Sequence, residues 1–258
     1  MDWLFIGQAL ACGFAMGFLI SFSGVGGGVL VIPALSLFFG LPISAAIGTA
    51  SAYTALTKVF AAAEHWRRGH IHFGLFWRFL AGAAPGAILT AAAINLTLHW
   101  QPQYREIVQG SLKVLVIAAI IAAIFFMFFV KGKGNDKSGG GGKTSRTTTA
   151  SGFGIGMIMG ATGIGGGVLI VPALLAGGEL PKRVVGTSII IALALSALSA
   201  LVYAGGGQVR FDLMLWMLAG SVFAVPVGGY VLHRSSEVFV RHALVVVVSA
   251  ALVMMLIG

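Results

Sequence analysis

A glycine-rich motif that occurs twice most strongly limits what this chain can fold into. Residues 24–35 read GVGGGVLVIPAL and residues 163–174 read GIGGGVLIVPAL, with nine of the twelve positions identical at an offset of 139. Consecutive glycines in an apolar sequence weaken a helix, because glycine loses the most backbone freedom when it folds. Their recurrence in one register therefore indicates an internal duplication in which the backbone at the glycines has a specific role.

The duplication extends beyond the glycines. After a one-residue deletion, Gly48-Thr49 in the first copy matches Gly186-Thr187 in the second. This doubled pattern, in which GxGGG is followed by four residues, Pro-Ala-Leu and a later Gly-Thr pair, resembles the TauE/SafE sulfite exporter family of membrane transporters. The resemblance covers about residues 5–257. It implies transport, in the export direction, of small sulfur-containing anions such as sulfite, thiosulfate or organosulfonates.

The amino-acid composition indicates a polytopic membrane protein. The chain has 58% apolar and 9% charged residues, whereas soluble domains carry roughly 25% charged residues. Its net charge of +9 comes mostly from loops between apolar segments. Such loops are typical of the cytoplasmic side of a membrane, so we expect no nucleic-acid partner. We expect the chain to lie in the inner (plasma) membrane, surrounded by the lipid bilayer.

Apolar segments divide each half of the chain in the same way. The predicted segments are 4–22, 28–40, 43–63, 73–97, 106–130, 149–162, 167–177, 182–204, 211–232 and 238–257. A helix rises about 1.5 Å per residue and needs around 20 residues to cross a hydrocarbon core of about 30 Å. The last three segments of each half reach this length, whereas the short segments after the glycines do not. The sequence therefore predicts an all-α membrane protein with two homologous halves.

Two membrane topologies fit these segments. If each glycine motif only interrupts one spanning helix, the halves are parallel and the basic loop residues divide 8 to 5 between the two sides. If each motif is the tip of a re-entrant hairpin, or of two short segments that turn back, the halves are inverted and the division is 11 to 2. The second division is more typical of membrane proteins, so we expect inverted repeats. The choice between re-entrant tips and broken helices stays open at this point.

The inverted reading also sets the expected domain organisation. We predict a first transmembrane repeat at 1–131, a flexible cytoplasmic linker at 132–148 and a second transmembrane repeat at 149–258, with both chain termini on the extracytoplasmic side. The linker is rich in Gly, Ser and Thr, a composition typical of flexible tethers.

Helix starts at the glycines would form a substrate site. A helix that begins inside a membrane has backbone N–H groups that hydrocarbon cannot satisfy, and its N-terminus favours oxyanions. The candidate substrate-binding glycines are Gly24, Gly26, Gly27, Gly28, Gly163, Gly165, Gly166 and Gly167. The alternative is that these glycines only let helices cross closely. We assign that packing role to the glycines at four-residue spacing, which are Gly13, Gly17, Gly152, Gly156 and Gly160.

Polar side chains near both motifs complete the predicted site. The candidate hydroxyls are Ser23, Thr49, Ser51, Thr162, Thr187 and Ser188. A hydroxyl can donate a hydrogen bond to an oxyanion without a permanent charge, but it can also bond a carbonyl of its own helix. Lys58 lies on the helix that carries Thr49 and Ser51, where it could attract anions or extend its chain to the membrane interface.

Other functional classes lack the residues they need. No Asp or Glu lies deep in an apolar segment, and the six histidines lie in loops or at segment ends. We therefore expect no enzyme, no metal site and no cofactor. The expected mechanism is alternating access, and the competing functions are an anion channel on the same scaffold and a structural or assembly membrane protein. The glycine faces would permit a homodimer without requiring one.

Overall fold

A computed structural model describes residues 3–23, 27–67, 69, 71–129, 144–164, 169–176, 181–234 and 237–257. The regular elements found in this part of the chain are helices, and none of them is a strand. The α-helices are α1 (Trp3–Ser23), α2 (Gly28–Phe39), α3 (Ile43–Arg67), α4 (Phe73–Trp100), α5 (Arg105–Phe129), α6 (Thr144–Thr162), α7 (Ile170–Ala176), α8 (Pro181–Gly205), α9 (Phe211–Arg234) and α10 (Glu237–Ile257). A short 3₁₀ helix, η1 (Pro102–Tyr104), precedes α5.

The helices follow the predicted apolar segments closely, so the all-α prediction is confirmed. Local signals set several boundaries. Helix α2 ends at Phe39 and is followed by Gly40, whose φ of 60° is a left-handed conformation that glycine adopts without steric cost. Helix α4 begins after His72, whose imidazole accepts a hydrogen bond from the N–H of Leu75 at 3.0 Å. Helix α6 already begins at Thr144, before the boundary expected at residue 149.

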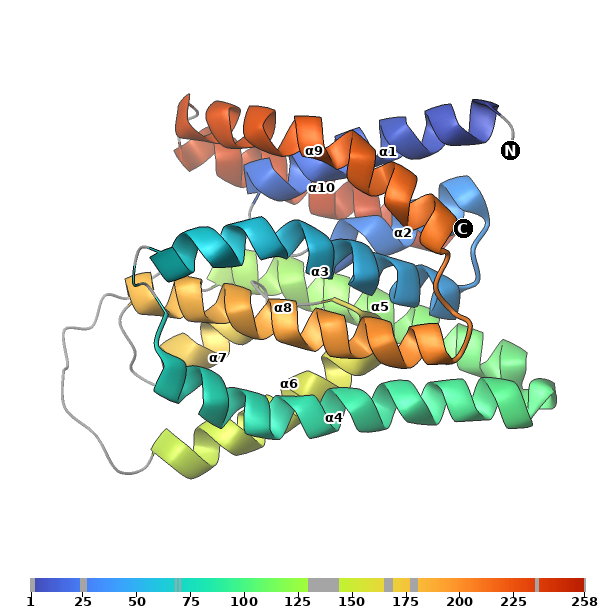
Figure 1. Ribbon diagram of the computed structural model, residues 1–258, viewed down its shortest axis with the longest axis horizontal. Coiled ribbons are helices and arrows are strands. Elements are labelled where there is room, and N and C mark those ends of the chain that lie inside the picture. The colour runs from blue at the N-terminus through green and yellow to red at the C-terminus, as the bar shows by residue number, and fades with distance from the viewer. Residues whose placement is uncertain are drawn as a thin grey trace.

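Helices α3 and α8 form a central antiparallel pair, which Figure 1 shows side by side. At one end, the Ser44 hydroxyl in the first turn of α3 donates a hydrogen bond to Gln208, just beyond α8, at 2.7 Å. At the other end, Thr187 in α8 bonds the backbone of His72, just beyond α3, at 3.0 Å. Corresponding helices of the two halves therefore run in opposite directions, in agreement with the inverted arrangement.

The four-residue glycine spacings mark close helix contacts, as predicted. Helix α1 packs along α9, and the corresponding helix α6 packs along α4 (Figure 1). A Cβ atom added to Gly17 of α1 would lie 2.5 Å from the Cβ of Ser221. A Cβ added to Gly152 of α6 would lie 2.7 Å from the carbonyl oxygen of Phe79. Because small residues let helix backbones approach in lipid, these glycines are explained by packing.

Helix α2 turns back along α1 after the first glycine motif. The rings of Phe5 near the start of α1 and Phe39 at the end of α2 lie 6.0 Å apart in an edge-to-face contact. At the other end of the pair, Ile20 approaches Gly27. The chain therefore reverses direction at the motif, and its placement as a re-entrant hairpin in a bilayer stays a prediction.

The described residues contain four helical stretches that are long and apolar enough to cross a membrane. These are Trp3–Ser21, Phe73–Trp100, Val184–Gly205 and Phe211–Gly228. Helix α3 has 25 residues but is not among them. Its polar side chains, Thr49, Ser51, Thr54 and Lys58 among them, lower its hydropathy. A central helix with this composition is a natural place to look for a site.

Candidate functional site

The two glycine motifs meet in the interior. A Cβ atom added to Gly28 would overlap the carbonyl oxygen of Gly163 and lie 2.9 Å from the Cα of Ile164. Gly163 itself has a φ of 60°, where any larger residue would be strained. The backbones at the start of α2 and just after α6 are therefore in direct contact, and glycine is needed at both positions.

One face of α3 lies against this junction. The Ser51 hydroxyl is 3.0 Å from the Cβ position of Gly163, and the Thr54 hydroxyl is 2.6 Å from that of Gly27. Both side chains are about 1% exposed. Since positions three residues apart share a helix face, the two hydroxyls point in one direction and reach one glycine of each motif.

Three polar atoms on this face are buried and have no hydrogen-bond partner in the described part of the chain. They are the Oγ of Ser51, the Oγ1 of Thr54 and the Nζ of Lys58. Positions 51, 54 and 58 follow the helical spacing that places side chains on one face, and we call these three residues the α3 polar face. A buried, unsatisfied polar group costs about 1–3 kcal/mol, and a charged one costs more. A bound ligand or an ordered water can satisfy such groups.

The start of α2 adds a fourth contribution to the junction. Its N-cap residue, Gly27, has no side chain that could cap the helix. Helix N-termini carry partial positive charge and exposed N–H donors, and they bind anions well. The α3 polar face and this helix start together present donors and no described carboxylate, so the arrangement can bind a small anion.

Two of the predicted hydroxyls are occupied within their own helices. Thr162 donates to the carbonyl of Ile158 at 2.6 Å and also accepts from the N–H of Ile164 at 3.3 Å. Ser188 donates to the carbonyl of Val185 at 2.8 Å. The helix-carbonyl alternative therefore describes both residues in this structure.

Thr49 and Thr187 form a reciprocal pair of links between the two halves. Thr49 accepts a hydrogen bond from the backbone N–H of Arg210 at 3.0 Å, and Thr187 accepts one from the N–H of His72 at the same distance. His72 and Arg210 correspond to each other in the duplication. The Arg210 guanidinium is paired with Asp212 at 2.7 Å, and this hydrogen bond raises the pKa of Arg210. Substrate binding by the two threonines stays a prediction.

The remaining predicted positions lie outside the described residues. They are Gly24, Gly26, Gly165, Gly166, Gly167 and the side chain of Ser23. The structure adds Thr54, which the sequence did not single out. Its helical spacing from Ser51 and Lys58 was the available signal, but a hydroxyl in a helix most often bonds its own backbone.

The α3 polar face has no equivalent in the second half. At the offset of 138 that relates α3 to α8, the counterparts of Ser51, Thr54 and Lys58 are Ile189, Ala192 and Ser196. Ala192 packs in an apolar cluster with Ile170 and Leu174 of α7. The site is therefore one-sided, although the glycine motifs themselves are duplicated.

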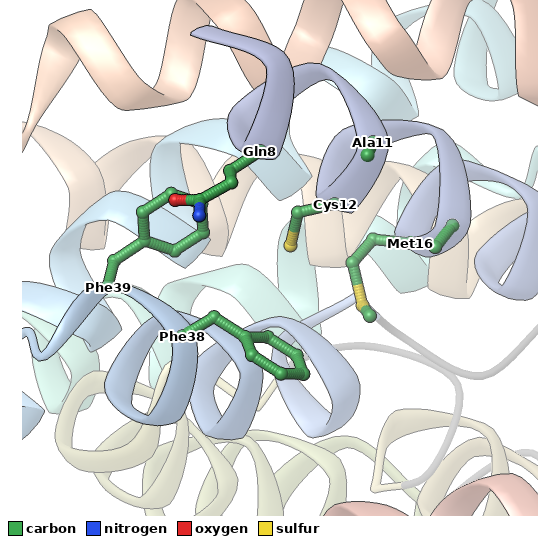
Figure 2. A pocket seen from close by; sticks show the side chains of 7 residues that line it. Gln8, Ala11, Cys12, Met16, Phe38 and Phe39 are labelled. Carbon is green, nitrogen blue, oxygen red and sulfur yellow. The ribbon is translucent and has the colours of Figure 1, made fainter. Parts of the chain in front are cut away.

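Two cavities lie away from this junction. The first, of about 290 Å³, lies between α1 and α2, where Figure 2 shows Cys12 and Met16 facing Phe38. Its lining is largely apolar and suits no charged ligand. The second, of about 380 Å³, is more open and is lined in part by Gln109 and Lys113 of α5. Among the described side chains, no group of three His, Cys, Asp or Glu could hold a metal ion.

Comparisons with known proteins show that the chain is similar to a family of membrane transporters. A family model described as "Sulfite exporter TauE/SafE" matches residues 9–255. The Bacillus subtilis (strain 168) protein named "Probable membrane transporter protein YjnA" is 29% identical over 228 residues, which are 87% of this chain and 89% of that protein. A Haemophilus influenzae protein named "Probable membrane transporter protein" is 29% identical over 218 residues, 79% of this chain and 76% of its own length. No solved structure matches the chain.

Proposed function

Because the chain belongs to the TauE/SafE sulfite exporter family, we propose that this multi-pass membrane protein carries small sulfur-containing anions, such as sulfite, thiosulfate or an organosulfonate, out across the inner membrane. The anion binds where the two glycine motifs meet the α3 polar face. Transport proceeds by alternating access, in which one half rocks against the other around this point.

The observation that carries the proposal is the set of unsatisfied donors on α3. Among the described residues, the Ser51 and Thr54 hydroxyls and the Lys58 amine have no hydrogen-bond partner, and the two hydroxyls lie beside Gly163 and Gly27. An oxyanion has several acceptor oxygens and can satisfy all of them at once. Two of the three donors are neutral, so the site can bind the ion without holding it too tightly for release. No other group of described side chains offers this combination.

Flux measurements with matched variants test the proposal. Purified protein in proteoliposomes should take up radiolabelled sulfite, thiosulfate or sulfoacetate with saturable kinetics. Ser51→Ala and Thr54→Val should each raise the KM roughly tenfold or more, since a hydrogen bond to a charged group is worth about 1.5–3 kcal/mol. Thr57→Val is the control, because the Thr57 hydroxyl on the same helix already donates to the carbonyl of Thr54 at 3.1 Å.

Two results would contradict the proposal. An unchanged KM in Ser51→Ala and Thr54→Val would show that the anion does not bind at the α3 polar face. Flux that rises linearly with concentration and shows no counterflow would instead indicate an anion channel on the same scaffold.

A further inference from the structure

Lys58 is the ionisable member of the α3 polar face, and its amine is isolated. The Nζ atom is buried and has no hydrogen-bond or ion-pair partner among the described side chains. In a helix, side chains lean toward the N-terminus, so the Lys58 chain extends toward the turn that carries Thr54. Ionisable side chains inside a membrane are costly, and in known membrane proteins they mark ion pathways and proton relays.

No described carboxylate is placed to neutralise Lys58. Helix α3 packs against α2, α5, α8 and α9. Besides Lys58, the described ionisable side chains on α3 and these helices are Tyr53, His65, Arg67, Arg105, Glu106, Lys113, Tyr203, Asp212 and Tyr230, and α2 carries none. Helix α1, whose Gly13 carbonyl accepts a hydrogen bond from Tyr53, adds Cys12. Asp212 is paired with Arg210 beside the first turns of α3, and Glu106 lies in the first turn of α5, near Gln109, which bonds Ser44. Both carboxylates therefore belong to the end of α3 that is remote from Lys58.

Protonation of Lys58 is coupled to anion binding, because an isolated buried charge has a high free-energy cost. A buried ammonium without a partner is expensive, whereas one beside an anion is stabilised. An empty site therefore favours the neutral amine, and an occupied site favours the ammonium. Binding adds one proton from water to the Nζ lone pair as the anion enters, and release returns both to water, with no other bond made or broken.

We propose that Lys58 makes this protein an anion–proton symporter, in which one proton accompanies each anion in the same direction. The inference rests on the proposed function and names its coupling ion. The stoichiometry is one because the position that corresponds to Lys58 in the second half is Ser196, which carries no titratable group. A monoanion then crosses without net charge, whereas a dianion such as thiosulfate carries one net negative charge. The direction of net flux follows the sum of the anion, proton and electrical gradients.

Simultaneous flux measurements test the coupling. Proteoliposomes that contain a fluorescent pH indicator, with the membrane potential clamped by potassium and valinomycin, receive radiolabelled thiosulfate outside. The wild type should acidify the lumen with one proton per anion taken up. Lys58→Arg keeps a permanent positive charge, so it should still exchange internal for external thiosulfate but lose the acidification. Lys58→Met should reduce both thiosulfate exchange and lumenal acidification at least tenfold. Lys113→Met should behave as the wild type.

The outcomes separate the coupling from the proposed function. Thiosulfate uptake by the wild type without lumenal acidification would overturn the symport and leave anion transport in place. Acidification at the wild-type ratio in Lys58→Arg would overturn the role of Lys58. A wild type that neither binds nor moves sulfite, thiosulfate or sulfoacetate would overturn the proposed function, and the symport with it. Thermal unfolding of each purified variant shows that it is folded.

Discussion

A buried hydroxyl without a partner makes Thr54 costly in the empty protein. Replacing it by the isosteric valine removes an unsatisfied group, so Thr54→Val should be about 1–2 kcal/mol more stable without anion. The same change removes a donor from the site and should weaken anion binding. Thermal unfolding with and without thiosulfate measures both effects. A lower Tm for Thr54→Val in the absence of anion would mean that the hydroxyl has a structural partner.

Gly28 has no side chain, and this lets the two glycine motifs come into direct contact. A Cβ there would overlap the carbonyl of Gly163, so Gly28→Ala should push α2 and the end of α6 apart and cost about 1–3 kcal/mol. Flux should fall at least tenfold. Gly154→Ala in α6 is the matched control, because a Cβ at Gly154 meets nothing within 4 Å. Equal thermal stability of the two variants would contradict the described contact.

At the scale of helices, the threonine links lie at opposite ends of the α3–α8 pair. Thr49 bonds the loop after α8, and Thr187 bonds the loop after α3. In alternating access, one hydrogen bond should favour the inward-open state and the other the outward-open state. Thr49→Val and Thr187→Val should therefore shift the equilibrium between these two states in opposite directions. Loss of about 1 kcal/mol corresponds to a shift of roughly fivefold. Opposite changes of KM on the two faces of oriented vesicles would show this, and changes of the same sign would exclude it.

The sequence predicted the helices better than the site. Hydropathy locates each helix, but the polar first turn of α6 at Thr144 gives no apolar signal, so the sequence places it in the linker. Glycine spacing predicted close packing at Gly17 and Gly152 because small residues have a simple geometric effect. The isolation of Thr54 could not be predicted, since only three-dimensional neighbours show that a hydroxyl lacks a partner. For the same reason the sequence indicates one site with matched contributions from both halves, whereas α8 packs Ala192 where α3 carries Thr54.

At the scale of the whole molecule, an inverted arrangement of the two halves predicts which loops face the cytoplasm. In a Cys12→Ala background, single cysteines at Lys137 and Ser235 should react with a membrane-impermeant maleimide only from the cytoplasmic side. A cysteine at Gln103, in the 3₁₀ helix η1 before α5, should react only from the opposite side. Labelling of Lys137→Cys and Ser235→Cys from different sides would indicate parallel halves and would contradict the antiparallel pairing of α3 and α8.

The position of a bound anion tests the central claim most directly. Selenite resembles sulfite and contains a heavy atom that scatters anomalously, so a crystal of the protein grown with selenite would locate it. We predict one selenium peak per chain, within hydrogen-bonding reach of the Ser51 and Thr54 hydroxyls and the Lys58 amine and next to Gly27. A peak only in the open cavity beside Lys113, with the α3 polar face empty, would contradict the account.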